Sequence, residues 1–424
     1  MNIKNLRLAV IGLGYVGLPL AVEFAKKRKV VGYDVNDKRI NELNSGYDKT
    51  LEINNGRFKV SKNLKLVKKI EDIKDCNCFI ITVPTPIDKK NKPNLSFLLK
   101  ASKEVGKILK PNDIVIYEST VYPGCTEEKC VPILVSTSGL KFNKDFFCGY
   151  SPERINPGDK KHKIQDIKKI VSGSNKKITD TIDMLYSEII LAGTHKVYSI
   201  IVAEAAKIIE NTQRDLNIAL LNELSIIFNK LEINTSEVIT AAKTKWNFIP
   251  FLPGLVGGHC IGVDPYYLTH KAQKLGYRPK IILAGRKLNN SMSSHVVSKF
   301  TEHLKEKKIK IKNSRILILG LTFKENCPDL RNSKIKDIFE KLKNKKCKVD
   351  LYDPMAENVE IKSMYGKNQV SKFSLNTYDG IIIGVGHNKF KSMGIDYIKS
   401  LCKINHVIFD LKSLFNKKFS NFQL

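Results

Sequence analysis

The first part of the chain alternates short apolar runs with a stretch of helical spacing. Residues 6–36 read LRLAVIGLGYVGLPLAVEFAKKRKVVGYDVN, in which one apolar run ends at Gly12 and a second ends at Asp34. Short apolar runs bounded by turn residues are typical of buried strands, and the amphipathic stretch between them is typical of a helix. The pattern predicts a strand, a glycine turn, a helix and a second strand.

Two further apolar runs follow in the same part of the chain, CFIITVP at 78–84 and DIVIYEST at 113–120. Helical patterns separate them. Strands that alternate with helices form parallel sheets with helices on both faces. We therefore expect a doubly wound parallel sheet in the N-terminal region.

The middle of the chain predicts one long helix. No glycine or proline occurs from Thr194 to Ile249, and apolar residues recur at helical spacing for many turns. A helix of some 30 residues spans about 45 Å, which is longer than a small domain needs. Such a helix suits a spine between domains or a dimer interface, and the two roles are compatible.

The alternation of strand and helix returns in the last third of the chain. Apolar runs stand at 314–323, 347–354, 379–387 and 406–414. The turn after the first of these runs, GLTFKEN, lacks the full glycine fingerprint of a dinucleotide site. The sequence predicts the α/β class, with two Rossmann-like doubly wound parallel-sheet domains joined by a long central helix.

Composition narrows the class of protein. The chain has 424 residues, 42% of them hydrophobic, which suits a folded protein of two or three domains. No apolar window approaches membrane-spanning length and no signal-peptide cleavage site follows the N-terminus, so we expect a cytoplasmic protein with no membrane partner. The nine cysteines form no paired CxxC motif, so we expect reduced thiols and no metal site.

The chain is strongly basic, with a formal net charge of +30. Its lysines and arginines are spread along the chain, and no basic run is interleaved with aromatic residues. A nucleic-acid partner is therefore not expected, whereas a basic field favours small anionic substrates such as nucleotides.

The glycine turn has the features of an NAD site. Glycines at 12, 14 and 17 permit a tight turn and a close approach of a pyrophosphate to the helix N-terminus. Asp34 ends the second strand, where a carboxylate accepts from the ribose 2′-hydroxyl and repels a 2′-phosphate. We assign to the cofactor Gly12, Gly14, Tyr15, Val16, Gly17, Asp34, Arg39, Thr85 and Thr120. Arg39 also begins the next helix, where residues are more often solvated.

For the other candidate residues, the neighbouring sequence is weaker evidence of a function. Thr85 and Thr120 follow predicted strands, at the edge where ligands bind parallel sheets, but threonines there are also common turn residues. Lys207 and Asn211 stand four apart on the long helix and share a face, which is either solvated or functional.

Cys260 lies in the stretch GLVGGHCIGVDPYYL, behind two glycines and four residues before Asp264. A thiol in an open glycine turn can form a thiolate that attacks an aldehyde, provided that positive charge such as that of Lys207 is near. His259 is expected to pack or to hydrogen-bond instead. The alternative is that Cys260 is a small buried hydrophobe, as most free cysteines are.

Together these motifs resemble the UDP-glucose/GDP-mannose dehydrogenase family over essentially the whole chain. GLGYVGLPLA, VPTP, ESTVYPG, SPERINPG, AEAAKIIENT, GGHCIGVDP and GLTFKENCPDLRNS occur in the order of that family. The resemblance implies an NAD-binding domain at 1–197, a central helical dimerisation domain at 198–308 and a UDP-sugar-binding domain at 309–424. It also implies a homodimer.

The resemblance implies a four-electron oxidation of a sugar C6 hydroxyl to a carboxylate by two NAD molecules in succession. By motif, Cys260 matches the family's nucleophile, which holds a thiohemiacetal and then a thioester. Lys207 and Asn211 match groups that stabilise an oxyanion at C6, and Asp264 matches a carboxylate that organises the lysine and water. Glu153 and Thr120 match groups that position water or transfer protons.

The resemblance also implies the substrate contacts and class. Substrate positions are matched by Glu153, Arg154, Lys207, Asn211, Gly257, Lys324 and Arg331. Pro157 stands where glucose-specific relatives carry a second glutamate, which leaves the hydrolytic base open. The GGHCIGVDPYYL form resembles the branch acting on UDP-N-acetylhexosamines, with UDP-GlcNAc preferred over UDP-GalNAc and UDP-glucose, in capsule or O-antigen synthesis. The rival interpretation is a non-catalytic sensor that binds NAD or a nucleotide sugar.

Overall fold

The computed structural model describes residues 3–50, 52–53, 62–88, 90–154 and 163–424. The chain divides into two compact units, and the segments 1–210 and 266–278 make up unit 1, while 211–265 and 279–424 make up unit 2. The central helices are thus shared between two units, and the three domain boundaries expected from the sequence stay a prediction.

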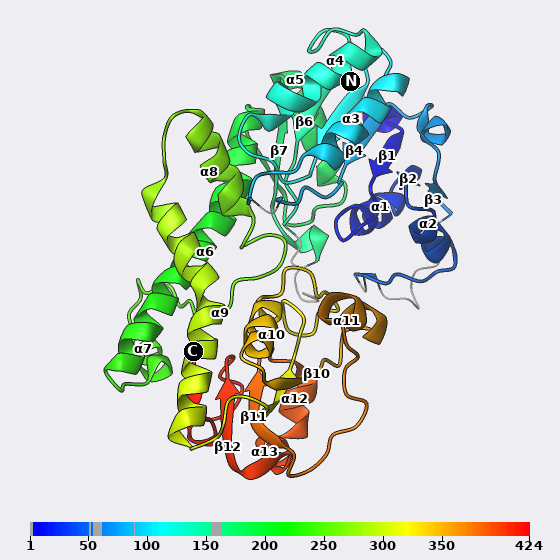
Figure 1. Ribbon diagram of the computed structural model, residues 1–424. Coiled ribbons are helices and arrows are strands. Elements are labelled where there is room, and N and C mark those ends of the chain that lie inside the picture. Colours follow the sequence, from blue (N-terminus) through cyan, green and yellow to red (C-terminus); the bar gives the residue numbers. More distant parts are fainter. Residues whose placement is uncertain (1–2, 51, 54–61, 89, 155–162) are drawn as a thin grey trace. The chain divides into compact units, whose positions relative to one another are not determined.

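Unit 1 is built on an eight-stranded sheet with the strand order β3-β2-β1-β4-β5-β6-β7-β8 (Figure 1). Its strands are β1 Leu8–Ile11, β2 Val30–Tyr33, β3 Leu64–Val67, β4 Cys78–Ile81, β5 Ile114–Tyr117, β6 Phe147–Tyr150, β7 Lys169–Gly173 and β8 Thr194–Lys196. The central strands β1, β4 and β5 are buried at every position, as expected for a sheet covered on both faces.

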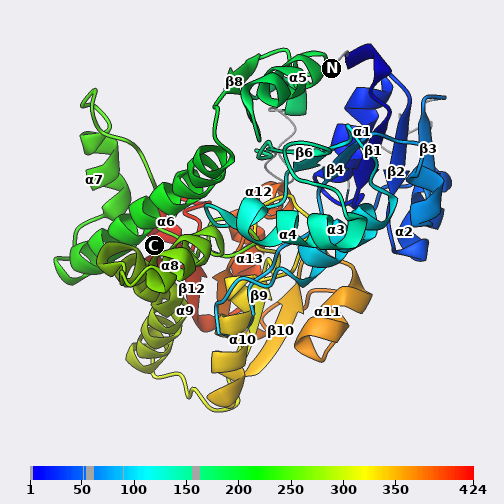
Figure 2. The same ribbon diagram turned by 90° about the horizontal axis from the view of Figure 1, so that it is seen from above.

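Helices cover both faces of this sheet, with α1 and α5 on one face and α3 and α4 on the other (Figure 2). The helices of unit 1 are α1 Gly17–Ala25, α2 Asp37–Asn44, α3 Ser96–Ile108, α4 Val131–Ser138 and α5 Lys176–Ser187. Leu18, Phe24 and Ile182 are among the side chains that pack α1 and α5 into one core with β1.

One pairing in unit 1 departs from the expected parallel sheet. Strands β6 and β7 are antiparallel, with Gly149 opposite Gly173 and Tyr150 opposite Ser172. The antiparallel pairing brings the beginning of β7 to the carboxyl end of β6.

Unit 2 contains the five-stranded parallel sheet β10-β9-β11-β12-β13. Its strands are β9 Arg315–Leu319, β10 Lys348–Tyr352, β11 Tyr378–Ile383, β12 Cys402–Asp410 and β13 Phe422–Gln423. Its helices include α7 Thr235–Ala242, α9 Lys280–Glu306, α10 Lys334–Asn344, α11 Asn358–Tyr365, α12 Asn388–Met393 and α13 Ile395–Ser400. Both units are therefore Rossmann-like, as the sequence predicts.

Two helices run from one unit into the other. The long helix expected from the sequence is α6, Ile200–Lys230, with 31 residues, and the second is α8, Asp264–Lys274. Among the described residues, no helix is long and apolar enough to span a bilayer.

Candidate active site

The glycine turn of unit 1 lies between β1 and α1, at the point where the strand order reverses between β1 and β4. Gly12 has a φ of 93°, which favours glycine, and a Cβ on Gly17 would overlap the Gly12 carbonyl oxygen and the Thr82 hydroxyl. Gly14 is exposed, with nothing within 4 Å of the position of a Cβ. Open space at Gly14, above a packed turn, fits a pyrophosphate that approaches the backbone.

The acidic residue of the fingerprint closes this turn. Asp34 follows β2, and its Oδ2 accepts from the backbone N–H of Leu13 at 2.8 Å, while Oδ1 accepts from that of Asn36 at 2.9 Å. The carboxylate therefore lies beside the turn with a fixed orientation. Tyr15 and Val16 are partly exposed in the same turn.

Arg39 is buried rather than solvated, which corrects the expectation for the start of α2. Its Nε donates to the carbonyl of Leu13 at 2.9 Å, and its guanidinium pairs with Asp48 at 2.8 Å and with Glu42 at 2.6 Å. The burial is tolerated because each of the three guanidinium nitrogens donates to an acceptor. Arg39 thus supports the glycine turn from within, and its contact with a cofactor stays a prediction.

The two predicted threonines lie at the same edge of the sheet. Thr85 follows β4 and accepts from the Tyr267 hydroxyl through its carbonyl at 2.7 Å, while Thr120 follows β5 and is half-buried. Sequence reasoning missed Thr82, whose hydroxyl donates to the carbonyl of Gly12 at 2.7 Å and ties β4 to the turn.

Lys207 is buried on α6, with only 4% of its surface exposed, and Asn211 is 8% exposed one turn later. Both lie on the face of α6 that packs inward, so the solvated-face alternative is wrong. Arg154 donates to the carbonyls of Lys207 at 3.1 Å and Ala206 at 3.0 Å and pairs with Glu210 at 2.9 Å. Arg154 therefore joins the SPER segment to α6 within unit 1.

Glu204, which sequence reasoning missed, stands one turn before Lys207 on α6. Its Oε1 accepts from the backbone N–H of Thr126 at 2.9 Å, and its other oxygen accepts from that of Gly124. Burial raises the pKa of Glu204 to about 7, against the opposing effect of these hydrogen bonds. The carboxylate holds the end of the YPG turn that follows Thr120.

Glu153 is nearly buried beside a lysine that the sequence did not single out. Its Oε2 lies 2.9 Å from Nζ of Lys169. The predicted departure at Pro157 lies outside the described residues.

Cys260, in unit 2, is exposed, whereas the other eight cysteines of the chain are buried, and none of these nine described residues forms a disulfide. The alternative of a buried hydrophobe is therefore wrong for Cys260. Its carbonyl accepts from the backbone N–H of Asp264 at 2.8 Å, in the turn that leads into α8. Asp264 is buried, and its Oδ2 accepts from the side-chain amide of Asn211 at 2.6 Å.

The structure thus brings Asn211, Asp264 and Cys260 together in unit 2, while Thr120, Glu153 and Lys207 belong to unit 1. The pairing of Lys207 with the thiol stays a prediction. As the sequence indicated, His259 makes a polar contact, at 3.3 Å from Asp329.

The two glycines before His259 permit a close backbone approach. A Cβ on Gly257 would lie 2.7 Å from the carbonyl oxygen of Asn332, and Gly258 has a φ of 80°. A side chain at Gly257 would push the cysteine turn away from the 332 loop, and one at Gly258 would overlap the ring of Phe323.

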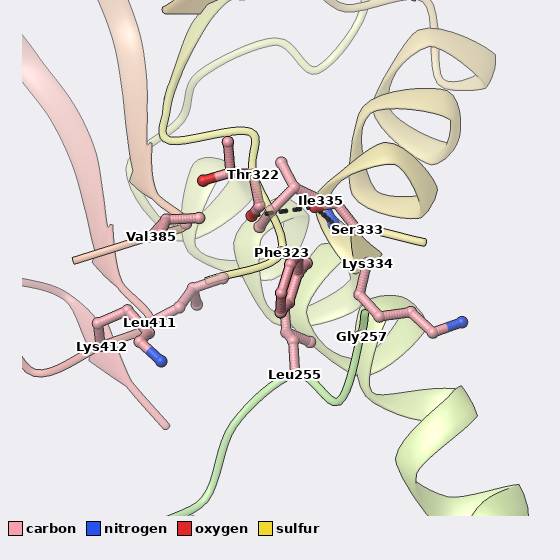
Figure 3. A pocket seen from close by; sticks show the side chains of 11 residues that line it. Leu255, Gly257, Thr322, Phe323, Ser333, Lys334, Ile335, Val385, Leu411 and Lys412 are labelled. Atoms are coloured by element: carbon pink, nitrogen blue, oxygen red, sulfur yellow. Dashed lines mark hydrogen bonds between the residues drawn. The ribbon is translucent and has the colours of Figure 1, made fainter. Parts of the chain in front are cut away.

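Gly257 also lines a small cavity in unit 2 (Figure 3). The cavity lies at the carboxyl ends of β9, β11 and β12, at the point where the strand order reverses between β9 and β11. Its lining includes the ring of Phe323 and the ammonium-bearing side chains Lys334 and Lys412. Lys334 begins α10, whose N-cap Ser333 also lines the cavity and accepts from the backbone N–H of Ile335.

Of the two predicted cations in unit 2, Arg331 is paired with Asp329, with distances of 3.0 and 2.7 Å to the two carboxylate oxygens. Burial alone would raise the pKa of Asp329, but hydrogen bonds from His259 and Arg331 hold it well below its usual range. The carbonyl of Lys324 accepts from the Thr322 hydroxyl at 3.0 Å. The motif GLTFKEN contains Phe323, but neither its ring nor the lysines of the cavity were singled out from the sequence, because nothing local to these residues marks them as cavity lining.

The described residues include no group of three or more His, Cys, Asp or Glu side chains that could hold a metal ion.

Three family models match consecutive parts of the chain. They describe the NAD binding domain of the UDP-glucose/GDP-mannose dehydrogenase family at 6–190, its central domain at 201–291 and its UDP binding domain at 317–417. The protein is an NAD-dependent dehydrogenase, and NAD is its cofactor. The NAD binding domain contains strands β1 to β7 of the unit 1 sheet. The chain belongs to the UDP-glucose/GDP-mannose dehydrogenase family.

Relatives of known name cover nearly the whole chain. A UDP-N-acetyl-D-glucosamine 6-dehydrogenase of Pseudomonas aeruginosa is 57% identical over 99% of this chain and 100% of its own length. One of Salmonella typhi is 57% identical over 97% of both chains. Among solved structures, a UDP-D-ManNAc dehydrogenase of Pyrococcus horikoshii has a TM-score of 0.87 at 31% identity, covering 97% of this chain and 96% of that one.

Proposed function

We propose that the protein oxidises C6 of UDP-N-acetylglucosamine to the uronic acid, with two NAD molecules reduced per sugar. The similarity to two UDP-N-acetyl-D-glucosamine 6-dehydrogenases at 57% identity supports the gluco N-acetyl sugar, whereas a UDP-N-acetyl-D-mannosamine dehydrogenase is 33% identical. The observation that carries the chemistry is Cys260, an exposed thiol in a glycine turn next to a buried amide–carboxylate pair.

NAD, held by the glycine turn and Asp34, supplies the hydride acceptor for both oxidations. The thiolate of Cys260 adds to the C6 aldehyde, holds it as a thiohemiacetal and, after the second oxidation, as a thioester whose C–S bond water breaks. One alcohol, one water and two NAD⁺ give one carboxylate, two NADH and three protons.

The other residues stabilise and orient this intermediate. Asn211 donates its amide to Asp264, which fixes the amide's orientation and leaves its second N–H for an oxygen on C6. Lys207 supplies positive charge for the same oxygen, and Glu153 and Thr120 position water or move protons. We place the uridine and pyrophosphate at the carboxyl edge of the unit 2 sheet, where Phe323 and Lys412 line a cavity beside the N-terminus of α10.

The test is the number of NADH molecules released per sugar, with UDP-GlcNAc, UDP-GalNAc and UDP-glucose supplied separately. Two NADH per UDP-GlcNAc, at the highest kcat/KM of the three, is the expected result. Cys260→Ser should lose acid formation and still bind NAD, and a variant with full acid formation would exclude the thiohemiacetal. Absence of turnover with every sugar would favour a binding protein.

We also propose a homodimer formed along α6. Four exposed apolar side chains are spaced so that they lie on one face of this helix. Their exposed fractions are 51% for Val202, 57% for Ile209, 52% for Leu220 and 44% for Ile227. An apolar stripe of this length is costly in water and is typical of a helix interface. Light scattering should give twice the chain mass, and Leu220→Glu should reduce it; a monomeric wild type would contradict the proposal.

The acid product suits a surface polysaccharide, as in capsule or O-antigen synthesis, and the reaction suits the cytoplasm, where NAD and UDP-sugars are available. The resemblance of the motifs supports this setting. Loss of a uronic acid from the surface polysaccharide after deletion of the gene would test it.

A further inference from the structure

A buried charge cluster lies at the edge of the unit 1 sheet where Glu153 stands. Nζ of Lys169, on β7, lies 2.9 Å from Oε2 of Glu153 and 3.1 Å from Oε2 of Glu118, which follows β5. Nζ also donates to the carbonyl of Pro152 at 3.3 Å. The second oxygen of Glu118 accepts from the hydroxyl of Tyr186 on α5. One ammonium is thus shared between two carboxylates.

The reversal of β7 places the lysine there. The β6–β7 pairing sets Tyr150 opposite Ser172, and the same register continued past the strand ends sets Glu153 opposite Lys169. On the other side of β6, the parallel pairing sets Tyr117 beside Tyr150, which brings Glu118 to the same edge. Three separate segments therefore converge on the lysine.

The cluster is almost completely removed from water. The exposed side-chain fractions are 4% for Lys169, 0% for Glu118 and 6% for Glu153. Burial opposes the charge of Lys169, but the two carboxylates outweigh it and raise its pKa. The ammonium therefore stays protonated and donates to both carboxylates.

This arrangement restricts Glu153 strongly. Its Oε2 is held by Lys169, and its Oε1 accepts from the backbone N–H of Arg154. Lys169 is itself held from behind by Glu118, which Tyr186 fixes in turn, and the ammonium lies over the Tyr186 ring at 5.1 Å from its centroid. A group that must meet a reacting atom gains rate from such fixed orientation.

We propose that Lys169 is a positioning residue that fixes the carboxylate of Glu153 for its part in the reaction, and that Glu118 and Tyr186 hold Lys169 in place. The inference rests on the proposed function of Glu153. It predicts that the lysine affects the rate of turnover and leaves the binding of NAD and of the UDP-sugar nearly unchanged, since Lys169 acts only through another side chain.

The experiment compares Lys169→Met, which keeps the length of the side chain and removes the charge, with Lys169→Arg, which keeps a cation. For Lys169→Met, kcat should fall about 100-fold, the order expected for a misplaced catalytic group, while KM and NAD affinity stay close to wild type. Lys169→Arg should recover most of kcat. If the slowed step is release of the acid, mass spectrometry should show the sugar bound to Cys260.

Arg28→Met is the matched control, because Arg28 also makes an ion pair within unit 1, with Glu188, at a place without a proposed role in chemistry. It should lower the melting temperature and leave kcat unchanged. Glu118→Gln removes one of the groups that hold Lys169 and should lower kcat relative to wild type. Should Lys169→Met not fold, a wild-type kcat in Glu118→Gln overturns the proposal.

The proposal fails if Lys169→Met retains the wild-type kcat, if Lys169→Arg is as slow as Lys169→Met, or if Arg28→Met slows turnover equally. Each of these outcomes leaves the proposed function standing, because wild-type protein still releases two NADH per sugar. Failure of the proposed function would instead appear in the wild type itself, before any variant is compared.

Discussion

Two alanine substitutions in the glycine turn after β1 should have different effects: one should weaken NAD binding, and the other should lower the stability of the fold. A Cβ on Gly14 meets nothing within 4 Å, whereas a Cβ on Gly17 overlaps the carbonyl oxygen of Gly12 and lies 3.0 Å from its carbonyl carbon. Gly14→Ala should therefore leave the fold intact and obstruct only a ligand. Gly17→Ala should force the first turn of α1 away from β1.

Gly14→Ala should mainly change the affinity for NAD, and Gly17→Ala should mainly change the free energy of unfolding. Gly14→Ala reduces the freedom of the unfolded chain and should change the free energy of unfolding by about 0 to +1 kcal/mol. If the methyl group displaces one charge-assisted hydrogen bond to the pyrophosphate, about 1.5–3 kcal/mol of binding is lost. This loss corresponds to a Kd for NAD about 10- to 150-fold higher. Gly17→Ala should cost about 1–3 kcal/mol of stability or more by overpacking.

Urea melts give the free energies of unfolding, and calorimetric titration with NAD gives the affinities. UDP-sugar binding serves as the control, since the unit 2 cavity does not contain the turn. The reasoning would be refuted if Gly14→Ala bound NAD as tightly as wild type, or if it lost as much stability as Gly17→Ala.

Three further predictions concern buried or partly buried carboxylates. Asp34→Ala should weaken NAD binding more than UDP-sugar binding in the same titrations, and equal weakening would count against the ribose assignment. Asp353→Ala removes the acceptor of the backbone N–H groups of Leu321, Thr322, Met355 and Ala356, and should lower the free energy of unfolding by about 3 kcal/mol or more; an unchanged urea midpoint would contradict this. Burial raises the pKa of Glu118 and of Glu204 from 4.5 to about 7, so the folded protein binds more protons than the unfolded chain in that window. The free energy of unfolding should therefore fall as the pH rises from 4.5 to about 7 in urea melts, with a shallower slope for Glu118→Gln, and a slope unchanged in that variant would contradict the assignment.

In both sheets, an aspartate accepts a hydrogen bond from the backbone of the turn that follows a central strand. Only one of the two aspartates was identified from the sequence. Asp34 accepts from the backbone N–H of Leu13 after β1, and Asp353 accepts from that of Leu321 after β9. The first aspartate was found because three glycines precede it. The second follows a turn without that fingerprint, and its carboxylate is occupied by backbone amides and by His387 at 3.1 Å.

The charged residues differ in how well the sequence predicted their surroundings. The spacing of Lys207 and Asn211 predicted a shared helix face correctly, because the helical repeat is local. Arg39 was expected to be solvated and is buried, since its acceptors Asp48 and Leu13 come from other segments. Lys169 looked like one more lysine of a basic chain, and only its partners distinguish it.

Local pattern was enough for the strand and helix periods, the glycine turn, the long helix and the family, because each depends on residues close in sequence or on motifs in a fixed order. The direction of β7, the cavity at the ends of β9, β11 and β12, and the charge cluster around Lys169 came only from the folded chain. Their physical reason is non-local: strand pairing and burial bring together segments that carry no mark of one another along the sequence.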